Sequence, residues 1–259
     1  MIDLQQGDCL ELMKSIPDGS VDMILCDLPY GTTSCKWDTV IPFTPLWDQY
    51  KRIIKDRGQI VIFATEPFTS QLVSSNLKWY REHLTWIKHR PSNFASAKYR
   101  HMKYTEDIIT FGNGSGTYNP QMQERISSRV AQGQKNNWIM PTQKKSEIAF
   151  KSDRKPLDSK KWDAKLRFPM DYLVFPAVVG NSKEKTTHPT QKPVKLLEYL
   201  IKTYSNENDT VLDNCMGSGS TGVAAVNLNR SFIGMELDCD YFKIAEQRIN
   251  EARRNVEIF

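Results

Sequence analysis

The sequence predicts an α/β fold built on a parallel, doubly wound sheet. Short apolar runs alternate along the chain with segments of helical periodicity, which is the pattern of successive strand–helix–strand units. Near the C-terminus, a glycine-rich turn at 213–222 stands between one such run and a helical segment. Residues 112–185 show no sustained period and are expected to form an irregular insertion into this sheet.

The N-terminal half supplies the first strands and helices. Val21–Cys26 is an apolar run that ends at Asp27, which indicates a strand entering a loop. Apolar residues at helical intervals predict a helix over 46–54, and Gly58 is expected to end it. The same criteria predict a strand over 59–64, a helix over 65–77, and strands over 83–87 and 107–111.

The C-terminal part resumes the alternation after the irregular segment. Helices are expected over 194–204, 220–228 and 241–253, and strands over 210–213 and 232–236. Only 37 residues follow Gly222, too few to complete a sheet, so earlier strands must complete it. The fold is therefore expected to be circularly permuted relative to a dinucleotide dehydrogenase, with one crevice shared by both ends of the chain.

Length and composition narrow the class of protein. The 259 residues fit one α/β domain with an elaboration, or two small domains. No stretch approaches the roughly 20 apolar residues of a membrane span, and the N-terminus lacks the features of a signal peptide. The five cysteines include no C-x-x-C pair. A cytoplasmic protein with reduced thiols and no membrane partner is expected.

Positive charge is concentrated in the middle of the chain. Residues 86–167 hold 17 Lys and Arg against 7 Asp and Glu, whereas the remainder holds 18 against 23. Aromatic residues are interleaved with this charge, among them Phe94, Tyr99 and Tyr104. A basic surface with aromatic rings suits a nucleic acid, although a solvated basic face has the same composition.

The glycine turn points to a cofactor. Gly217, Gly219 and Gly222 match the pattern G-x-G-x-x-G between a strand and a helix, where glycine permits a sharp turn close to a ligand. Glu236 follows Gly217 by 19 positions, at the end of the next strand, where an acidic side chain can hold ribose hydroxyls. The combination predicts a site for an adenosine-containing cofactor.

The segment Asp27-Leu28-Pro29-Tyr30 is expected over the same crevice, because it directly follows a strand. The exocyclic amine of a nucleobase is a poor nucleophile, and the Asp27 carboxylate and Leu28 carbonyl could accept its two hydrogens. Tyr30 offers a ring for stacking on an extruded base, and Pro29 fixes the backbone direction. Taken alone, the four residues also fit a strand-ending Asx turn.

Five segments together resemble the β group of S-adenosylmethionine-dependent DNA amino-methyltransferases. Residues 27–30 are similar to the D-P-P-Y motif of that family, and 213–225 to its cofactor motif, D-P-F-x-G-S-G-T-T-G. Its G-D-x-L-E, H-P-T-Q-K-P and F-I-G-x-E motifs are matched at 7–11, 188–193 and 232–236. The order of catalytic motif, target-recognition segment and cofactor motif also resembles the β group.

The resemblance implies a fold and a division of the chain. The fold would be a Rossmann-like class I methyltransferase sheet, circularly permuted, with a basic target-recognition insertion. Residues 1–111 and 186–259 would form the catalytic and cofactor-binding domain. Residues 112–185 would form the target-recognition region.

The resemblance also implies site residues. The catalytic residues would be Asp27, Leu28, Pro29 and Tyr30. The residues around S-adenosylmethionine would be Asp8, Asp27, Thr190, Lys192, Asp213, Cys215, Gly217, Ser218, Gly219 and Glu236. Asp8 would accept from the cofactor's adenine amine, Glu236 would bind its ribose, and Thr190 and Lys192 would hold its carboxylate. Trp37 is a candidate wall of the base pocket, His188 is expected to be structural, and this chemistry needs no metal.

Two positions depart from the family motifs. Leu28 replaces the first proline of D-P-P-Y, but the role belongs to its backbone carbonyl, so leucine should serve. Asn214-Cys215 replaces Pro-Phe in the cofactor motif, and the missing aromatic ring is expected to alter cofactor affinity. Cys215 is not interpreted as a nucleophile, because amine methylation requires none.

The expected reaction is methyl transfer to the N6 amine of adenine in double-stranded DNA, by base flipping and direct transfer, in a monomer or homodimer. In the family, Asp at the first motif position favours adenine and Ser favours cytosine, so N4-cytosine methylation is the nearest alternative. C5-cytosine methylation is disfavoured because no cysteine follows a proline. A nicotinamide-dependent oxidoreductase and a non-catalytic DNA-binding module are the alternatives from other classes.

Overall fold

The chain divides into two units. The computed structural model describes residues 1–31, 38–124, 165–180, 182, 184–186 and 191–257. One unit comprises Met1–Asn119 and Asp171–Phe259, and the other comprises Pro120–Met170. In the second unit, the described part contains a short antiparallel pair of strands, β6 (Gln123–Glu124) and β7 (Leu166–Arg167).

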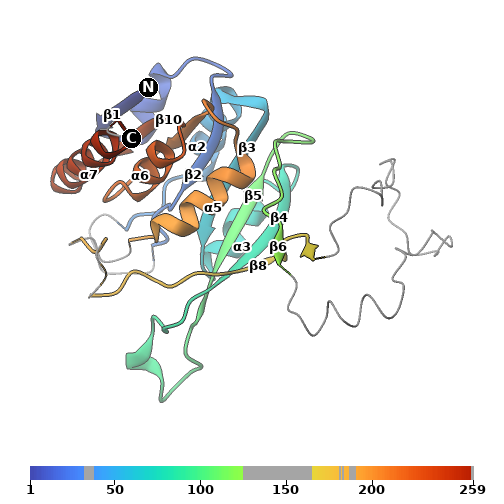
Figure 1. Ribbon diagram of the computed structural model, residues 1–259. Helices are drawn as coiled ribbons and strands as arrows, with labels where there is room; N and C mark the ends of the chain where they lie inside the picture. Colours follow the sequence, from blue (N-terminus) through green and yellow to red (C-terminus); the bar gives the residue numbers. More distant parts are fainter. Residues whose placement is uncertain (32–37, 125–164, 181, 183, 187–190, 258–259) are drawn as a thin grey trace, which may run out of the picture. The chain divides into compact units, whose positions relative to one another are not determined.

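The first unit is built on an eight-stranded sheet in the order β1-β10-β9-β2-β3-β5-β4-β8 (Figure 1). Its strands are β1 (Ile2–Gln6), β2 (Val21–Cys26), β3 (Ile54–Ala64), β4 (Tyr80–Ile87), β5 (Thr105–Phe111), β8 (Tyr172–Val174), β9 (Thr210–Asp213) and β10 (Ser231–Glu236). Within this sheet, β5 runs antiparallel to both of its neighbours, and every other adjacent pair is parallel. The sheet is therefore mostly rather than wholly parallel.

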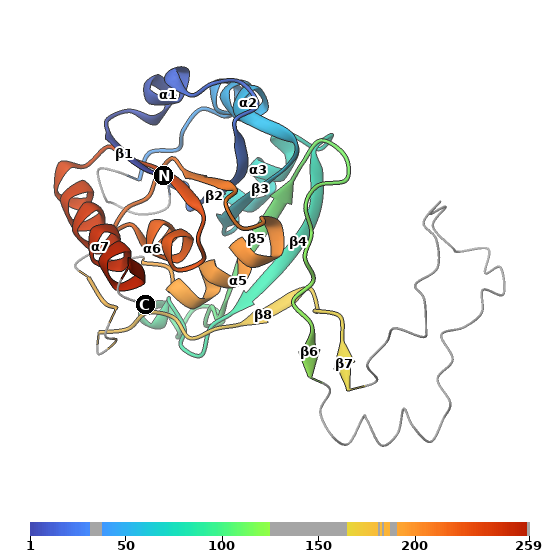
Figure 2. The same ribbon diagram turned by 45° about the horizontal axis from the view of Figure 1, so that its top comes forward.

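Strands from the two ends of the chain interleave in this sheet. The C-terminal strands β9 and β10 lie between the N-terminal strands β1 and β2, with Gln6 paired to Glu236 and Ile24 paired to Leu212. Figure 2 shows β1, where the chain begins, close to the C-terminal helix α7 (Cys239–Glu257). The circular permutation inferred from the position of the glycine turn is confirmed.

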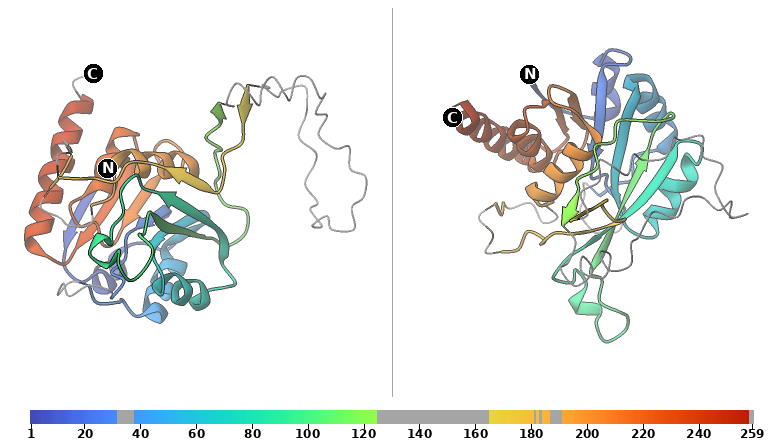
Figure 3. Two further views of the ribbon diagram at one scale, coloured as in Figure 1. Left: turned by 90° about the horizontal axis from the view of Figure 1, so that it is seen from below. Right: turned by 45° about the vertical axis from the view of Figure 1, so that its right-hand side comes forward.

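Helices cover both faces of the sheet (Figures 1 and 3). One face carries α1 (Cys9–Leu12), α2 (Phe43–Ile53) and α3 (Phe68–Ser75), and the other carries α5 (Val194–Tyr204), α6 (Ser220–Asn227) and α7. Successive side chains of β2 alternate between the two cores, with Ile24 on the α2 side and Met23 and Leu25 on the α5 side. Burial on both faces explains why the central strands are continuous apolar runs rather than alternating ones.

Most predicted elements are present, with shifted boundaries. The strand predicted at Val21–Cys26 is β2 and that at 210–213 is β9, with identical limits. The prediction that Gly58 ends the preceding helix is wrong, because α2 ends at Ile53 and Gly58 lies inside β3. A Cβ atom at Gly58 would lie 2.5 Å from the Ile54 side chain and 2.9 Å from the Asp22 carbonyl oxygen. The glycine thus marks a close approach within the sheet.

Two strands of the eight-stranded sheet were not predicted from the sequence. The β1 strand is only half-buried, so its pattern is weak, and β8 has three residues of which Leu173 alone is buried. Because β8 pairs with β4, the interval 112–185 contributes to the sheet as well as to the second unit. None of the helices in the described part of the chain is long and apolar enough to cross a membrane.

Candidate functional site

A cavity of about 420 Å³ lies in the first unit, beyond the carboxyl ends of β2, β9 and β10. This is the position at which open α/β sheets bind ligands, and the volume is in the range of cofactor sites. The cavity is lined by Asp8, Asp27, Leu28, Pro29, Tyr30, Lys192, Asp213, Cys215, Gly217, Ser218 and Glu236, together with residues not predicted. Among the predicted site residues that the structure describes, only Gly219 lies outside this lining.

The glycine turn forms one wall of the cavity. Gly217 and Gly219 both adopt left-handed backbone angles, with φ of +51° and +77°, which favour glycine. Gly219 also lies against α7, where a Cβ atom would come within 2.8 Å of the Ala245 backbone. Arg248 of α7 donates to the Ser218 carbonyl oxygen over 2.5 Å. Gly219 therefore shapes the turn from behind, and Gly217 and Ser218 line the cavity.

Glu236 joins the end of β10 to this turn. One carboxylate oxygen accepts the Gly217 backbone N–H at 2.8 Å, and the other accepts the Asp238 N–H at 2.8 Å. Burial raises the pKa of the Glu236 carboxyl, and these two hydrogen bonds oppose the shift. The carboxylate is held rigidly at the edge of the cavity, with lone pairs left for further donors.

Asp213 ends β9 beneath the turn and is 3% exposed. Its carboxylate accepts the Cys215 backbone N–H at 3.1 Å. Burial raises the pKa of this carboxyl to about 7, although hydrogen bonds from Thr221 and Cys215 work in the opposite direction. Asp213 therefore supports the turn from below.

Asn214 and Cys215, which depart from the family's cofactor motif, contact neighbouring side chains. Asn214 accepts from the Tyr50 hydroxyl at 2.6 Å, and its amide nitrogen lies 3.5 Å from the Cys9 sulfur and 3.7 Å from the Cys215 sulfur. Hydrogen bonding to Cys26 and burial raise the pKa of the Cys215 thiol well above its usual range. The thiol is therefore neutral at ordinary pH.

Asp8 lies at the opposite end of the cavity, where β1 gives way to α1. It is the N-cap of α1, and its carboxylate accepts the Leu10 backbone N–H at 2.8 Å. One oxygen thus fixes the start of the helix, and the exposed carboxylate keeps lone pairs free at the cavity wall.

The segment after β2 forms the facing wall. The Tyr30 hydroxyl donates to one oxygen of Asp27 at 2.5 Å, and the Lys192 ammonium pairs with the other oxygen. The Tyr30 ring packs against Phe68 of α3, with 5.2 Å between ring centroids. Leu28 is buried, which anchors the backbone between Asp27 and Pro29.

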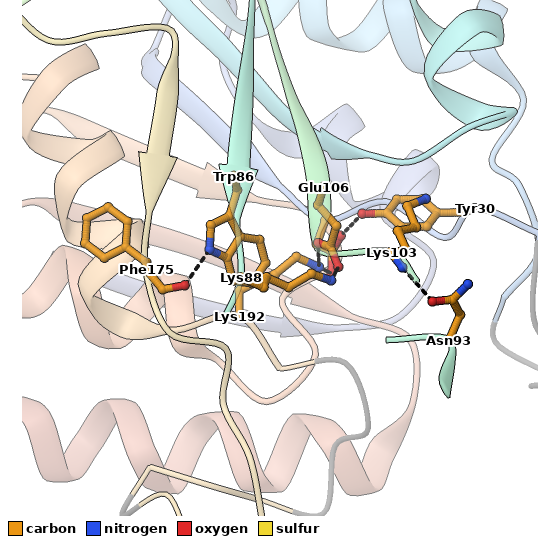
Figure 4. A network of polar contacts seen from close by, with 9 residues as sticks. Tyr30, Trp86, Lys88, Asn93, Lys103, Glu106, Phe175 and Lys192 are labelled. Carbon is orange, nitrogen blue, oxygen red and sulfur yellow. Dashed lines mark hydrogen bonds and ion pairs between the residues drawn. The ribbon is translucent and has the colours of Figure 1, made fainter. Parts of the chain in front are cut away.

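Two residues that the sequence interpretation did not identify extend this wall (Figure 4). Glu106, at the start of β5, lies 3.6 Å from the Lys192 ammonium and 2.6 Å from that of Lys88, which follows β4. Charges therefore alternate along Asp27, Lys192, Glu106 and Lys88. Charged residues next to two predicted strand ends were the available signal, but the sequence does not show which strands are neighbours or that Lys192 approaches them.

The neighbouring charges determine the pKa values of Glu106 and Lys192. Burial alone would raise the pKa of Glu106, but Lys192 and Lys88 outweigh it and lower that pKa. Burial alone would lower the pKa of Lys192, but Asp27 and Glu106 outweigh it and raise that pKa. Both groups are therefore charged at neutral pH, although Lys192 is only 8% exposed.

Three predicted residues lie outside the described part of the chain: Thr190, His188 and Trp37. Lys192, which follows them, is described and lies beside Asp27. Its role toward a cofactor carboxylate stays a prediction.

The residues present fit an adenosine cofactor that carries an amino-acid group. Acceptors for hydroxyls and an amine are available at Glu236 and Asp8, and the backbone of Gly217 is open to close approach. Lys192 supplies a buried cation for a carboxylate. Fold and cavity together define a Rossmann-like α/β enzyme of the class that binds such a cofactor across a permuted sheet.

Comparisons with known proteins give the family. Residues 21–247 match the family model described as DNA methylase, of N6 and N4 amino-methyltransferases. The chain therefore belongs to this family of S-adenosylmethionine-dependent DNA methyltransferases. The match includes the Asp27 segment and the glycine turn, and the recognised resemblance is confirmed.

Individual relatives agree with this assignment. Type II methyltransferase M2.MboI of Moraxella bovis is 26% identical, over 96% of this chain and 87% of its own. The crystal structure of the M1.HpyAVI–SAM complex has a TM-score of 0.63 and 25% identity, and the match covers 96% of this chain and all of that one. The cytosine-N4-specific PvuII DNA methyltransferase shares the fold, with a TM-score of 0.64 and 15% identity over 98% of this chain and 92% of its own.

Proposed function

We propose that this methyltransferase transfers a methyl group from S-adenosylmethionine to the N6 amine of adenine in double-stranded DNA. The observation that carries the proposal is that the Asp27 segment and the glycine turn, 186 positions apart at Asp27 and Asp213, line one cavity. When bound, the cofactor supplies a methyl group on a positively charged sulfur. The protein must present an amine nitrogen to it in a fixed orientation.

Asp27 and the Leu28 carbonyl are proposed to accept the two hydrogens of the target amine. Each carboxylate oxygen of Asp27 already has one partner, but a carboxylate offers about four lone-pair sites, so acceptor capacity remains. Two accepted hydrogen bonds favour a more tetrahedral nitrogen with an available lone pair. The proton released on methylation is proposed to pass to Asp27.

Tyr30 is proposed to stack on the extruded base. Its hydroxyl is tied to Asp27 and its ring is packed on Phe68, so the ring orientation is held from two sides. A fixed aromatic wall lowers the cost of ordering the base in the cavity. Pro29 limits backbone movement between this ring and Asp27.

The cofactor side is proposed to act through Glu236, Asp8, Lys192 and the backbone of Gly217 and Ser218. Glu236 would bind the ribose hydroxyls, Asp8 the adenine amine, and Lys192 and Thr190 the carboxylate. Asp213, Cys215 and Gly219 would shape the turn. The rigid backbone bonds of Glu236 support this arrangement, because they place its carboxylate beside Gly217 without depending on another side chain.

Residues 112–185 are proposed to recognise the target sequence. The positive charge of 86–167 supports binding to phosphates, and such contacts position a protein on the duplex while base contacts select the site. Whether the enzyme acts as a monomer or a homodimer would be measured by light scattering with and without DNA.

Sequencing with modified-base detection, applied to DNA from bacteria expressing the protein, tests the proposal. We expect N6-methyladenine at one recurring sequence, and no such mark with Asp27→Ala. N4-methylcytosine would show that the base assignment is wrong. Unmethylated DNA, together with binding of NAD rather than S-adenosylmethionine in isothermal titration, would overturn the reaction as well.

A further inference from the structure

The segment that joins β4 to β5, residues 89–104, is a second feature at the edge of the cavity, and we call it the arm. Figure 1 shows it projecting beyond the ends of the strands, away from the helices that cover the sheet. It belongs to the first unit and not to the segment 112–185.

The arm is an ordered hairpin. The Lys88 backbone N–H donates to the Tyr104 carbonyl at 2.7 Å, and the Ser92 N–H donates to the Lys103 carbonyl at 3.1 Å. Asn93 crosses between its two sides, because its side chain accepts from the Lys103 N–H at 2.6 Å (Figure 4). These bonds fix the backbone from which the surface side chains of the arm project.

Both roots of the arm lie at the catalytic wall. Lys88 precedes it and Glu106 follows shortly after it, and their side chains form the 2.6 Å ion pair that continues to Lys192 and Asp27. The base of the arm therefore adjoins the charged wall of the cavity, which Glu106 and Lys192 line.

The surface of the arm combines large aromatic rings with positive charge. Phe94 is 78% exposed and Tyr99 is 89% exposed, so neither aromatic ring belongs to the buried core. The arm contains Arg90, Lys98, Arg100 and Lys103 but no Asp or Glu. None of the ion pairs formed between described residues involves these four cations.

This chemistry selects one kind of ligand. Unpaired cations without any carboxylate attract a polyanion, and exposed rings bind flat, stackable groups. DNA next to an extruded base offers both, because phosphates flank a gap in the base stack. We infer that the arm contacts duplex DNA around the target base, with Phe94 and Tyr99 against bases or sugars and the cations against phosphates. The inference rests on the proposed function and adds a DNA-binding surface outside the target-recognition region.

The test compares two double variants of matched composition. Tyr99→Ala/Arg100→Gln removes an exposed ring and a cation from the arm. The control, Leu77→Ala/Lys78→Gln, removes an exposed apolar side chain and an exposed cation from the turn that precedes β4. This turn lies at the end of β4 opposite to the arm. Phe94→Ala is a further single variant. All the replaced side chains are exposed, so thermal unfolding should be unchanged within a few degrees.

We expect Tyr99→Ala/Arg100→Gln to weaken binding of a methylatable duplex at least about tenfold and to raise the KM for DNA equally. Titration with S-adenosylmethionine should give the wild-type affinity, and the Leu77/Lys78 control should behave as wild type. Arg100→Gln alone should reduce the slope of log affinity against log salt by about 0.9.

Unchanged DNA affinity in Tyr99→Ala/Arg100→Gln and in Phe94→Ala, in a protein whose wild type methylates DNA, would overturn the inference and leave the proposed function intact. Conversely, a wild type that methylates no DNA would contradict the proposed function, while loss of duplex binding in the arm variants would still support the arm. Arm-dependent binding to phosphatidylglycerol vesicles, with no binding to duplex DNA, would overturn the inference in favour of a membrane surface.

Discussion

The two walls of the cavity hold their carboxylates in different ways. On the wall formed by β9 and β10, Asp213 and Glu236 accept backbone N–H groups. On the wall formed by the segment after β2 and by the start of β5, Asp27 and Glu106 pair with lysine side chains. Backbone partners are fixed by the turn itself, whereas ion pairs between side chains can exchange when a new charge arrives.

The electrostatic consequence also differs. Burial raises the pKa of both Asp213 and Glu236, since no cation among the described residues pairs with either. The lysines instead lower the pKa of Glu106. The wall of Asp213 and Glu236 thus favours a ligand with positive charge or hydroxyl donors. On the wall of Asp27 and Glu106, the carboxylate charges are neutralised by lysines until a substrate displaces one of these partners.

The largest effect is expected from Asp27→Ala. Loss of the acceptor for the target amine should reduce kcat by about 10³-fold or more, because electrostatic stabilisation of the developing charge is lost. Affinity for S-adenosylmethionine should survive, since Glu236, Asp8 and Lys192 are all retained. Tritiated methyl incorporation and isothermal titration measure the two quantities. Persistent methyl transfer would show that the role given to Asp27 is wrong.

Asp213→Asn should change the pH dependence of stability. In the wild type, the carboxyl has a pKa of about 7 in the folded state and 3.8 as its ordinary value. Protonation of this carboxyl therefore stabilises the folded state fully below about pH 4, and this stabilisation is lost as the pH rises toward 7. Between pH 5 and pH 8, the wild-type free energy of unfolding should fall by about 2–3 kcal/mol relative to that of Asp213→Asn. Urea unfolding at both pH values measures the difference, and parallel pH curves would contradict it.

Glu236→Gln should act on cofactor binding alone. One acceptor oxygen is replaced by an amide donor next to Gly217, so S-adenosylmethionine affinity should fall about 10- to 100-fold. At saturating cofactor, kcat should stay within a few-fold of wild type. Titration calorimetry checks the affinity, with the exposed helix residue changed in Glu246→Gln as the control. A loss of kcat at unchanged cofactor affinity would contradict the cofactor-binding role given to Glu236.

Glu106→Gln is expected to have the smallest effect of the four, about tenfold on kcat, because it touches Asp27 only through Lys192. Removing this carboxylate lowers the pKa of Lys192, so the loss of activity on the alkaline side should begin at a lower pH. A pH–rate profile measures the shift. Asp107→Asn, which changes the neighbouring carboxylate bound to Thr69 and His83, is the control. Identical profiles for Glu106→Gln and wild type would rule out this positioning role.

Local signals predicted most of the framework. Continuous apolar runs identified β2 and β9, since central strands are buried on both faces. The helix predicted at 194–204 has the limits of α5, because its apolar stripe is unbroken. Short or half-buried strands such as β8 lacked such a signal, and Gly58 was misinterpreted because a glycine at a close strand contact looks like a helix stop.

The candidate site was predicted where motif residues are contiguous. The Asp27 segment and the glycine turn could be found from the sequence because each depends on a short run of residues at a strand end. Glu106 and Lys88 could not be found, because their pairing follows from the adjacency of β4 and β5 and from the approach of Lys192.

The sequence by itself determined the family, the permuted order of the strands, and the two motifs that face the cavity. These depend on local spacing and on the number of residues after Gly222, which need no coordinates. Only the tertiary structure decided how Asp27 is held, and that the arm begins and ends at the catalytic wall. Those facts depend on how strands β2, β4 and β5 pack and on the approach of Lys192, 165 positions from Asp27. The energies of such contacts depend on distance and burial rather than on sequence position.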